Sequence, residues 1–198
     1  MLSITLAKHN ASCNANSGGV SRAWLFDPAD FTWTQASATA ADPLPPYTAV
    51  ALSTGATLVG GSGFYPINFY YLSASYKATH SMKNSANKWT HEFSCFLPQI
   101  SSDLTGYIAN IQATSTCASV GLVIEDFNGT ITIVGEGVIN ANPIPGVWRM
   151  LMDGSSEETG KALDDENGVN LVIKGDYNRK AIQFTGGLSA ILALVETV

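Results

Sequence analysis

The sequence predicts an α+β protein that is mainly β: an antiparallel β-sandwich or half-barrel with one flanking helix at about 102–113. Apolar and polar residues alternate on both sides of Asn128 and Gly129, a pair typical of hairpin turns. The pattern returns about forty residues later, where Asn167 and Gly168 precede a second alternating run. We therefore expect a sheet of hairpins, with Asn128-Gly129 as a two-residue turn of positive φ.

Length and composition indicate a single domain over residues 1–198. A chain of this length can bury roughly 70% of its unfolded surface. Charged residues make up only 13% of the chain, below the ~25% of ordinary soluble domains, and such a surface suits assembly. The net charge is -6, which disfavours binding to nucleic acid by charge.

The cysteines and the termini favour a cytoplasmic protein. Cys13, Cys95 and Cys117 are odd in number and widely spaced, so we expect reduced thiols without metal. Residues 1–19 lack a basic signal-peptide start and are expected to form a flexible or assembly-ordered arm. The apolar tail at 188–195 is shorter than the ~20 residues of a membrane span.

In the first half, alternation and turn residues predict a series of short strands. The aromatic segment 64–76 predicts a long strand interrupted near Pro66. The expected shorter strands are 20–26, 31–33, 47–52 and 56–59.

The next segment, 77–88, contains Lys77, Lys83 and Lys88 without any acid, and we expect it to be a polar loop excursion. A strand follows at 89–97, with both faces partly buried. The helix is then predicted by N-cap oxygens at 101–103 and by Leu104, Ile108 and Ile111 at helical spacing.

After the central hairpin, the segment 153–166 carries many carboxylates and predicts a solvated loop or short helix. It is preceded by a short apolar strand at 148–152. A second hairpin-like unit is expected over 169–184, and 188–195 is expected to be a last strand or a helical turn.

No residue pattern indicates catalysis, a cofactor or a metal. Ser62 lies between two glycines but lacks the context of a nucleophile elbow. His80 and His91 have no further ligands at zinc spacing. The acidic run ending at Gly168 has some likeness to a calcium loop, but a turn is the better interpretation.

Several sequence features occur together along the chain. Cys13 is followed by Gly18-Gly19-Val20, a polar excursion precedes 89–93 (WTHEF), and the helix is followed by the motifs VIEDFNGTITIVGEG and SEETGKALDDENGVNLVIKG. Together they resemble the tail tube proteins of long-tailed bacteriophages, in particular the divergent forms of phages of the Bacteroidetes. The resemblance covers nearly the whole chain.

This resemblance implies a structural protein of the virion, without catalytic residues or cofactors. Its copies would form rings, commonly hexameric, that stack into a tube through which DNA passes as a non-specific passenger. The implied partners are further copies of the chain and other tail proteins. The protein would be made in the host cytoplasm and would end in the virion tail.

Two alternatives remain open. A capsid decoration or tail-completion protein could use the same sheet and acidic charge. A carbohydrate-binding β-sandwich would use Trp24, Trp89 or Trp148 as an exposed stacking platform.

Charge is unevenly distributed, and this predicts the subunit contact. A basic segment precedes the strand at 89–97, and an acidic segment follows residue 152, so the two could meet between copies. We also expect a net acidic lumen wall that does not retain DNA, and Lys83 and Lys88 turned toward a neighbour. The candidate interface residues are Lys77, Lys83, Lys88, Glu157, Glu158, Asp164 and Asp165.

Overall fold

The computed structural model describes residues 18–39, 44–53, 55–58, 62–83, 86–117, 120–135, 138–139, 142–143, 151–158 and 167–195. Strands dominate these residues, which confirms the α+β, mainly β class. The elements in chain order are β1 (Val20–Phe26), η1 (Pro28–Asp30), β2 (Phe31–Gln35), β3 (Tyr47–Leu52), β4 (Tyr65–Pro66), β5 (Ser75–Lys83), β6 (Ala86–Pro98), α1 (Ser102–Cys117), β7 (Gly121–Asp126), β8 (Ile131–Val134), β9 (Val138–Ile139), β10 (Asn142–Pro143), β11 (Leu151–Glu158), β12 (Gly168–Tyr177), β13 (Ile182–Phe184) and α2 (Leu188–Leu192).

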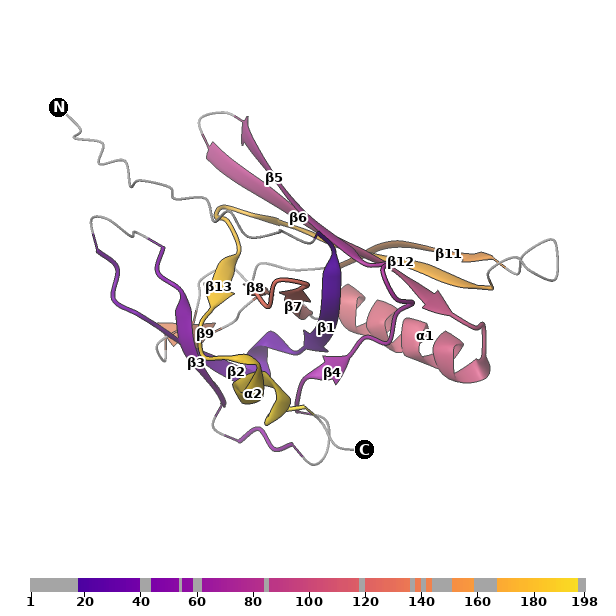
Figure 1. The fold of residues 1–198 in the computed structure, drawn as a ribbon, viewed down its shortest axis with the longest axis horizontal. Coiled ribbons are helices and arrows are strands. Elements are labelled where there is room, and N and C mark those ends of the chain that lie inside the picture. The colour runs from indigo at the N-terminus through magenta and orange to yellow at the C-terminus, as the bar shows by residue number, and fades with distance from the viewer. Residues whose placement is uncertain are drawn as a thin grey trace.

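The strands form two sheets (Figure 1). A curled nine-stranded sheet has the order β10-β9-β2-β3-β13-β8-β7-β1-β4, and a four-stranded sheet has the order β11-β12-β6-β5. All the strand pairs are antiparallel except β13 with β3 and β2 with β9. This arrangement agrees with the predicted sandwich or half-barrel.

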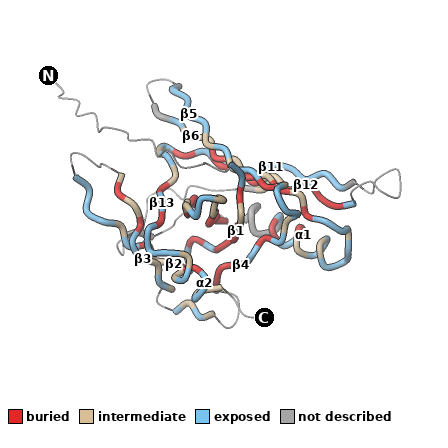
Figure 2. The backbone as a smooth tube through the Cα atoms, in the orientation of Figure 1, coloured by how far each residue is buried: buried red, intermediate tan, exposed pale blue. Residues whose placement is uncertain are grey.

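The larger core lies between the two sheets. Alternate residues of β6 and β12 point into it, and Ile108 and Ile111 of α1 complete it beside the sheets. Figure 2 shows the buried backbone running along β6, β12 and β1. Besides the helix residues, its fully or nearly fully buried members include Leu25, Phe93, Cys95, Leu97, Leu122, Ile124, Val169, Leu171 and Ile173.

A second core lies on the other side of β1, β7 and β8, inside the curl of the nine-stranded sheet. It is mostly aromatic, and Phe31 and Phe64 stack with ring centroids 4.2 Å apart. Ile191 of α2 closes it. Because these strands have a core on each face, β7 carries apolar residues without interruption from Leu122 to Ile124.

Several expected elements are confirmed. β1 and β3 have the predicted bounds, and β2 and β6 include the strands expected at 31–33 and 89–97. Helix α1 begins at Ser102, where Ser101 Oγ accepts a hydrogen bond from the Leu104 N–H at 3.1 Å. It continues to Cys117, four residues beyond the expected end at 113.

The prediction that residues 77–88 form a polar loop excursion is wrong. Most of them lie in the β5–β6 hairpin, in which Lys77 is opposite Glu92 and Lys83 is opposite Ala86. The polar residues occupy the outer side of an exposed edge strand. The sequence of this strand therefore lacks the alternation of apolar and polar residues by which a strand is recognised. The long strand expected at 64–76 is also wrong, because β4 has two residues and the chain turns before β5.

The central turn is a hairpin connection, but it is longer than predicted. Gly129 has φ +76°, whereas Asn128 is not among the residues of positive φ. The Gly129 N–H donates to the Asp126 carbonyl at 3.0 Å, and the Asp126 N–H donates to the Thr130 carbonyl at 3.0 Å. Residues 127–129 therefore form a three-residue loop with only the glycine left-handed.

Asn167 and Gly168 do not form a second turn of this kind. Gly168 begins β12 and lies opposite Pro98 of β6 and Glu158 of β11. A Cβ atom at Gly168 would lie 2.3 Å from the Leu97 carbonyl oxygen and 2.5 Å from the Phe96 ring. Close packing, and not a positive φ, requires glycine there.

Two further expectations for the second half are wrong. Part of the acidic segment predicted as a loop or short helix at 153–166 lies in strand β11, which pairs with β12. The predicted hairpin over 169–184 does not form, because β12 and β13 belong to different sheets. Residues 1–17 of the expected arm and residues 159–166 lie outside the described residues.

Candidate assembly interface

The four-stranded sheet is the candidate site because both of its edges are long. β5 forms one edge with nine residues, and β11 forms the other with eight. The edges of the nine-stranded sheet, β10 and β4, have two residues each. Proteins usually shorten or block edge strands, because their outward N–H and C=O groups recruit other strands. Within the described residues, these two edges are therefore the strongest candidates for pairing with another chain.

The two edges carry opposite charge. β5 contains Lys77 and Lys83 and no carboxylate, and β11 contains Asp153, Glu157 and Glu158 and no cation. The predicted basic and acidic interface segments thus contribute the two opposite edges of one sheet. Figure 2 shows both strands largely exposed, and the Lys77 and Glu157 side chains are exposed.

Lys88, predicted to face a neighbour, has a partner within its own chain. Its Nζ lies 2.8 Å from Asp176 Oδ2 of the same chain. This ammonium group, together with a hydrogen bond from Thr90 Oγ1 at 2.7 Å, lowers the pKa of Asp176. Asp164 and Asp165, also predicted at the interface, lie outside the described residues.

The outer face of the four-stranded sheet, which points away from the nine-stranded sheet, is polar. Lys174 Nζ lies 3.4 Å from Asp153 Oδ2 and 3.7 Å from Glu92 Oε2. The hydrogen bond and charge of Asp153, followed by the charge of Glu92, raise the pKa of Lys174. The outer-face residues of β5, β6 and β12 are Ser75, Lys77, Thr79, Ser81, Lys88, Thr90, Glu92, Ser94, Phe96, Asn170, Val172, Lys174 and Asp176.

The charges on this outer face are balanced. The lysines at 77, 88 and 174 stand against Glu92, Asp176 and the Asp153 carboxylate that reaches Lys174. The described residues of this face are therefore not net acidic, and the acidic lumen wall stays a prediction.

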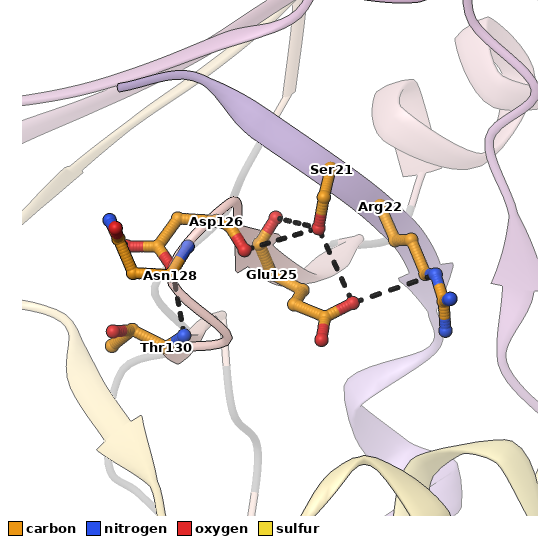
Figure 3. A network of polar contacts seen from close by, with 6 residues as sticks. All are labelled: Ser21, Arg22, Glu125, Asp126, Asn128 and Thr130. Atoms are coloured by element: carbon orange, nitrogen blue, oxygen red, sulfur yellow. Dashed lines mark hydrogen bonds and ion pairs between the residues drawn. The ribbon is translucent and has the colours of Figure 1, made fainter. Parts of the chain in front are cut away.

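The β7–β8 hairpin tip is held by the side chain of Asp126 (Figure 3). Its Oδ1 accepts hydrogen bonds from the N–H groups of Asn128 and Thr130, both at 2.8 Å. The carboxylate thus satisfies backbone donors that the loop leaves without a strand partner. Asp126 therefore has a structural role in the turn. The motif DFNG is consistent with this role.

Beside this tip, Ser21 and Arg22 of β1 fasten the hairpin to the sheet (Figure 3). The pairing of β1 with β7 is irregular between Val20 and Arg22, so Ser21 is the extra residue of a bulge. Ser21 Oγ lies 3.1 Å from the Glu125 carbonyl oxygen, and Arg22 Nε lies 3.6 Å from Glu125 Oε2. These contacts replace the ladder bonds that the bulge interrupts.

His91 has a role in connecting strands that was not predicted from the sequence. It is fully buried, its Nε2 lies 3.2 Å from the Arg179 carbonyl oxygen, and its Nδ1 lies 2.6 Å from the Tyr76 hydroxyl. Because a carbonyl only accepts, Nε2 carries a proton, and in the neutral ring Nδ1 accepts from Tyr76. The residue thereby ties β5 and β6 to the connection that leaves β12. A burial pattern at 89–97 was the only signal in the sequence.

An open groove of about 880 Å³ lies between the hairpin tip and the segment before β13. Its lining includes Asp126, Lys180, Tyr76 and two threonines. The Asp126 carboxylate accepts hydrogen bonds from the N–H groups of the turn. In the described part of the chain, no group of three or more His, Cys, Asp or Glu residues could hold a metal. The groove thus has a mixed polar and apolar lining.

The remaining predicted residues fall into the interior or outside the described ranges. Cys95 is buried as a free thiol, and this burial raises its pKa to about 12. Trp24 is buried. Trp89 is partly buried, and its ring centroid lies 4.9 Å from that of His80. Neither tryptophan provides the open platform expected of a carbohydrate-binding module. Cys13 and Trp148 lie outside the described residues, and the Cys117 side chain is not described.

Among the described residues, no helix is long and apolar enough to cross a membrane. Comparison of the chain with models of protein families, with curated proteins and with solved structures finds no match. The geometry of the four-stranded sheet and the sequence resemblance are therefore the observations that bear on function.

Proposed function

We propose that this chain is a subunit of a closed homo-oligomeric ring, and that the rings stack into a tube of the kind that phage tail tube proteins form. The observation that carries the proposal is the four-stranded sheet with two long edges of opposite charge. Pairing the β5 edge of one copy with the β11 edge of the next would continue the sheet from copy to copy.

Charge selects a head-to-tail contact. Two β5 edges would bring lysines together, and two β11 edges would bring carboxylates together, so like edges repel. Unlike edges attract. A contact between two different surfaces repeats around an axis and generates a ring when the rotation closes.

Strand direction is compatible with this contact. The order β11-β12-β6-β5 is antiparallel at every step, so β11 and β5 run in opposite directions. A neighbour related by rotation about an axis along the strands therefore presents β11 antiparallel to β5. The sheet can then continue across the contact without a change of pattern.

The stagger of the strands also favours closure. β11 pairs through β12 with residues 92–98 of β6, and β5 pairs with residues 86–94. The centres of these stretches, Cys95 and Thr90, lie five residues or about 17 Å apart along β6. Over three strand spacings of about 4.8 Å, this is a slant of roughly 50°. Strands in closed barrels tilt by a similar ~35–45°.

In such a ring the outer face of the four-stranded sheet would line the lumen, because the nine-stranded sheet and α1 occupy the other side. The lysines at 88 and 174 are already paired with carboxylates, so they offer little to a passing DNA phosphate. Non-specific binding to DNA depends on cations that release counterions from the phosphates. A polar wall with paired charges would let DNA move as a passenger.

The proposal is tested by reversing each edge separately. One variant carries Lys77→Glu and Lys83→Glu, which makes both edges acidic, and the other carries Glu157→Lys and Glu158→Lys, which makes β11 basic like β5. Neither variant should assemble alone. An equal mixture should assemble, because alternating copies place an acidic edge beside a basic edge at every contact.

Assembly is measured by sedimentation velocity and by negative-stain microscopy, in which rings and tubes are distinguished directly. Lys180→Glu and Asp103→Lys serve as controls, because both residues are exposed and lie outside the edge strands. Wild-type protein that stays monomeric at every concentration would contradict the proposal. So would a mixture that assembles no better than its components. Rings that never stack would favour a decoration or tail-completion protein.

A further inference from the structure

The turn between β4 and β5 exposes three large apolar side chains in succession. Tyr70, Tyr71 and Leu72 are 54%, 71% and 64% exposed. Among the described residues, the other exposed large apolar side chains are Met82 and Leu192, which lie in separate elements. More than half of this exposed apolar set is therefore concentrated in one turn.

The turn is fixed to the four-stranded sheet by hydrogen bonds. The Tyr70 N–H donates to the Phe96 carbonyl at 2.8 Å, and the Phe96 N–H donates to Ser73 Oγ at 3.2 Å. The Ser73 N–H donates to the Tyr70 carbonyl at 3.0 Å. Ser73 thus occupies the place beside Phe96 that a further residue of β5 would take. The turn is a rigid continuation of the β5 edge.

Leu72 holds a conformation that leucine rarely adopts. Its φ is +64°, in the left-handed region where the Cβ atom clashes with the following backbone. The side chain is mostly exposed, so packing within the chain does not offset this cost. Leu72 is the third residue of the turn closed by the Ser73 N–H and the Tyr70 carbonyl, a position of positive φ that glycine or asparagine usually occupies. A leucine kept at this position presents its side chain to the outside of the chain.

We propose that Tyr70, Tyr71 and Leu72 form the apolar anchor of the contact between two copies of this chain, at the end of the β5 edge. The inference rests on the ring proposed above. A second copy fits because the turn continues the edge already complementary in charge to β11, and because residues 62–76 contain no charge. Charge sets register and encounter rate more than affinity.

The anchor also supplies apolar contact area, which strand pairing lacks. A stable interface buries roughly 800 Å² per partner, with aromatic side chains at its centre. The two polar edge strands provide hydrogen bonds but little apolar area. Tyr71 is preorganised, because its ring packs edge-on against Phe127 with centroids 5.9 Å apart. A rigid aromatic loses little side-chain freedom on binding.

The test compares Leu72→Gly and Tyr71→Ser with a control, Leu192→Ser, which removes an exposed leucine of α2. Each protein is examined by sedimentation velocity over a concentration series and by thermal denaturation of the dissociated form. Leu72→Gly should raise the concentration for half-assembly by about tenfold or more. Its Tm should stay equal or rise by a few degrees, because the positive φ is relieved. The control should assemble as the wild type does.

A leucine with only a structural role would give the opposite result, a lower Tm with unchanged assembly. If wild-type protein assembles and both turn variants assemble equally well, the anchor is wrong while the ring proposal stands. If wild-type protein never assembles, the ring proposal and the anchor both fail. Loss of assembly in the control as well as in the turn variants would also contradict the anchor.

Discussion

Gly129 and Gly168 are the last residues of the segments DFNG and DENG, yet substitutions at them should destabilise the protein for different reasons. Gly129 has φ +76°, and a Cβ atom there would meet nothing within 4 Å. At Gly168 a Cβ atom would lie 2.3 Å from the Leu97 carbonyl oxygen, within the β12–β6 ladder. The first site restricts backbone conformation, and the second restricts volume.

The expected magnitudes follow from these contacts. Gly129→Val should lower the free energy of unfolding by about 1–2 kcal/mol, because a β-branched residue resists positive φ. Gly129→Asn should cost less than about 0.5 kcal/mol, since asparagine tolerates this region. Gly168→Ala should cost about 2–3 kcal/mol, because backbone atoms must move to accept the new methyl group. Gly168→Asn should cost at least as much.

Urea denaturation of the dissociated protein, followed by circular dichroism, measures these differences. Gly129→Asn and Gly168→Asn should differ by about 2 kcal/mol, which this measurement resolves. A Gly168→Ala variant as stable as the wild type would contradict the close packing at this site. So would a protein that tolerates asparagine at 168 and not at 129.

Three further predictions concern side chains. Cys95 should resist thiol reagents in the folded protein at pH 8, because its pKa is raised to about 12, and unfolding without reductant should expose three thiols. The pKa of Asp176 is lowered in the folded state by Lys88, so its stabilisation is present above about pH 4 and is lost on acidification; Asp176→Asn should flatten the acid limb of stability measured against pH. His91→Phe should cost about 2 kcal/mol in urea denaturation, since it removes the buried ring nitrogens that contact the Arg179 carbonyl and the Tyr76 hydroxyl.

The sequence predicted the fold class and the strands whose burial alternates. β1 and β3 were placed correctly because turn residues bound them and because apolar residues mark their core-facing sides. Partners of strands were less predictable. Tyr177 ends β12 and Ile182 begins β13 with only four residues between them, yet the two strands lie in different sheets. In this connection the Arg179 carbonyl contacts His91, which is 88 residues away in sequence.

The candidate interface residues were predicted by charge, but their arrangement was not. Opposite charge on two segments indicates that they attract something, and it does not distinguish a contact within the chain from one between chains. Lys88 shows this ambiguity, because it was expected to face a neighbour and also pairs with Asp176 of its own chain. Lys77 and Glu157 were recognised by the same rule and lie exposed on opposite edges.

Two errors of secondary-structure prediction fall on the edge strands of the four-stranded sheet. Residues 77–88 and 153–166 were expected to be loops, because neither shows a strong apolar period, and the structure assigns their described parts largely to β5, β6 and β11. An alternating pattern records burial of one strand face against the chain's own core. An edge strand that reserves its backbone for a neighbour needs little such burial, and it gains solubility from polar and charged side chains while it is alone. Sequence rules fail at these strands for the same physical reason that suits the strands to assembly.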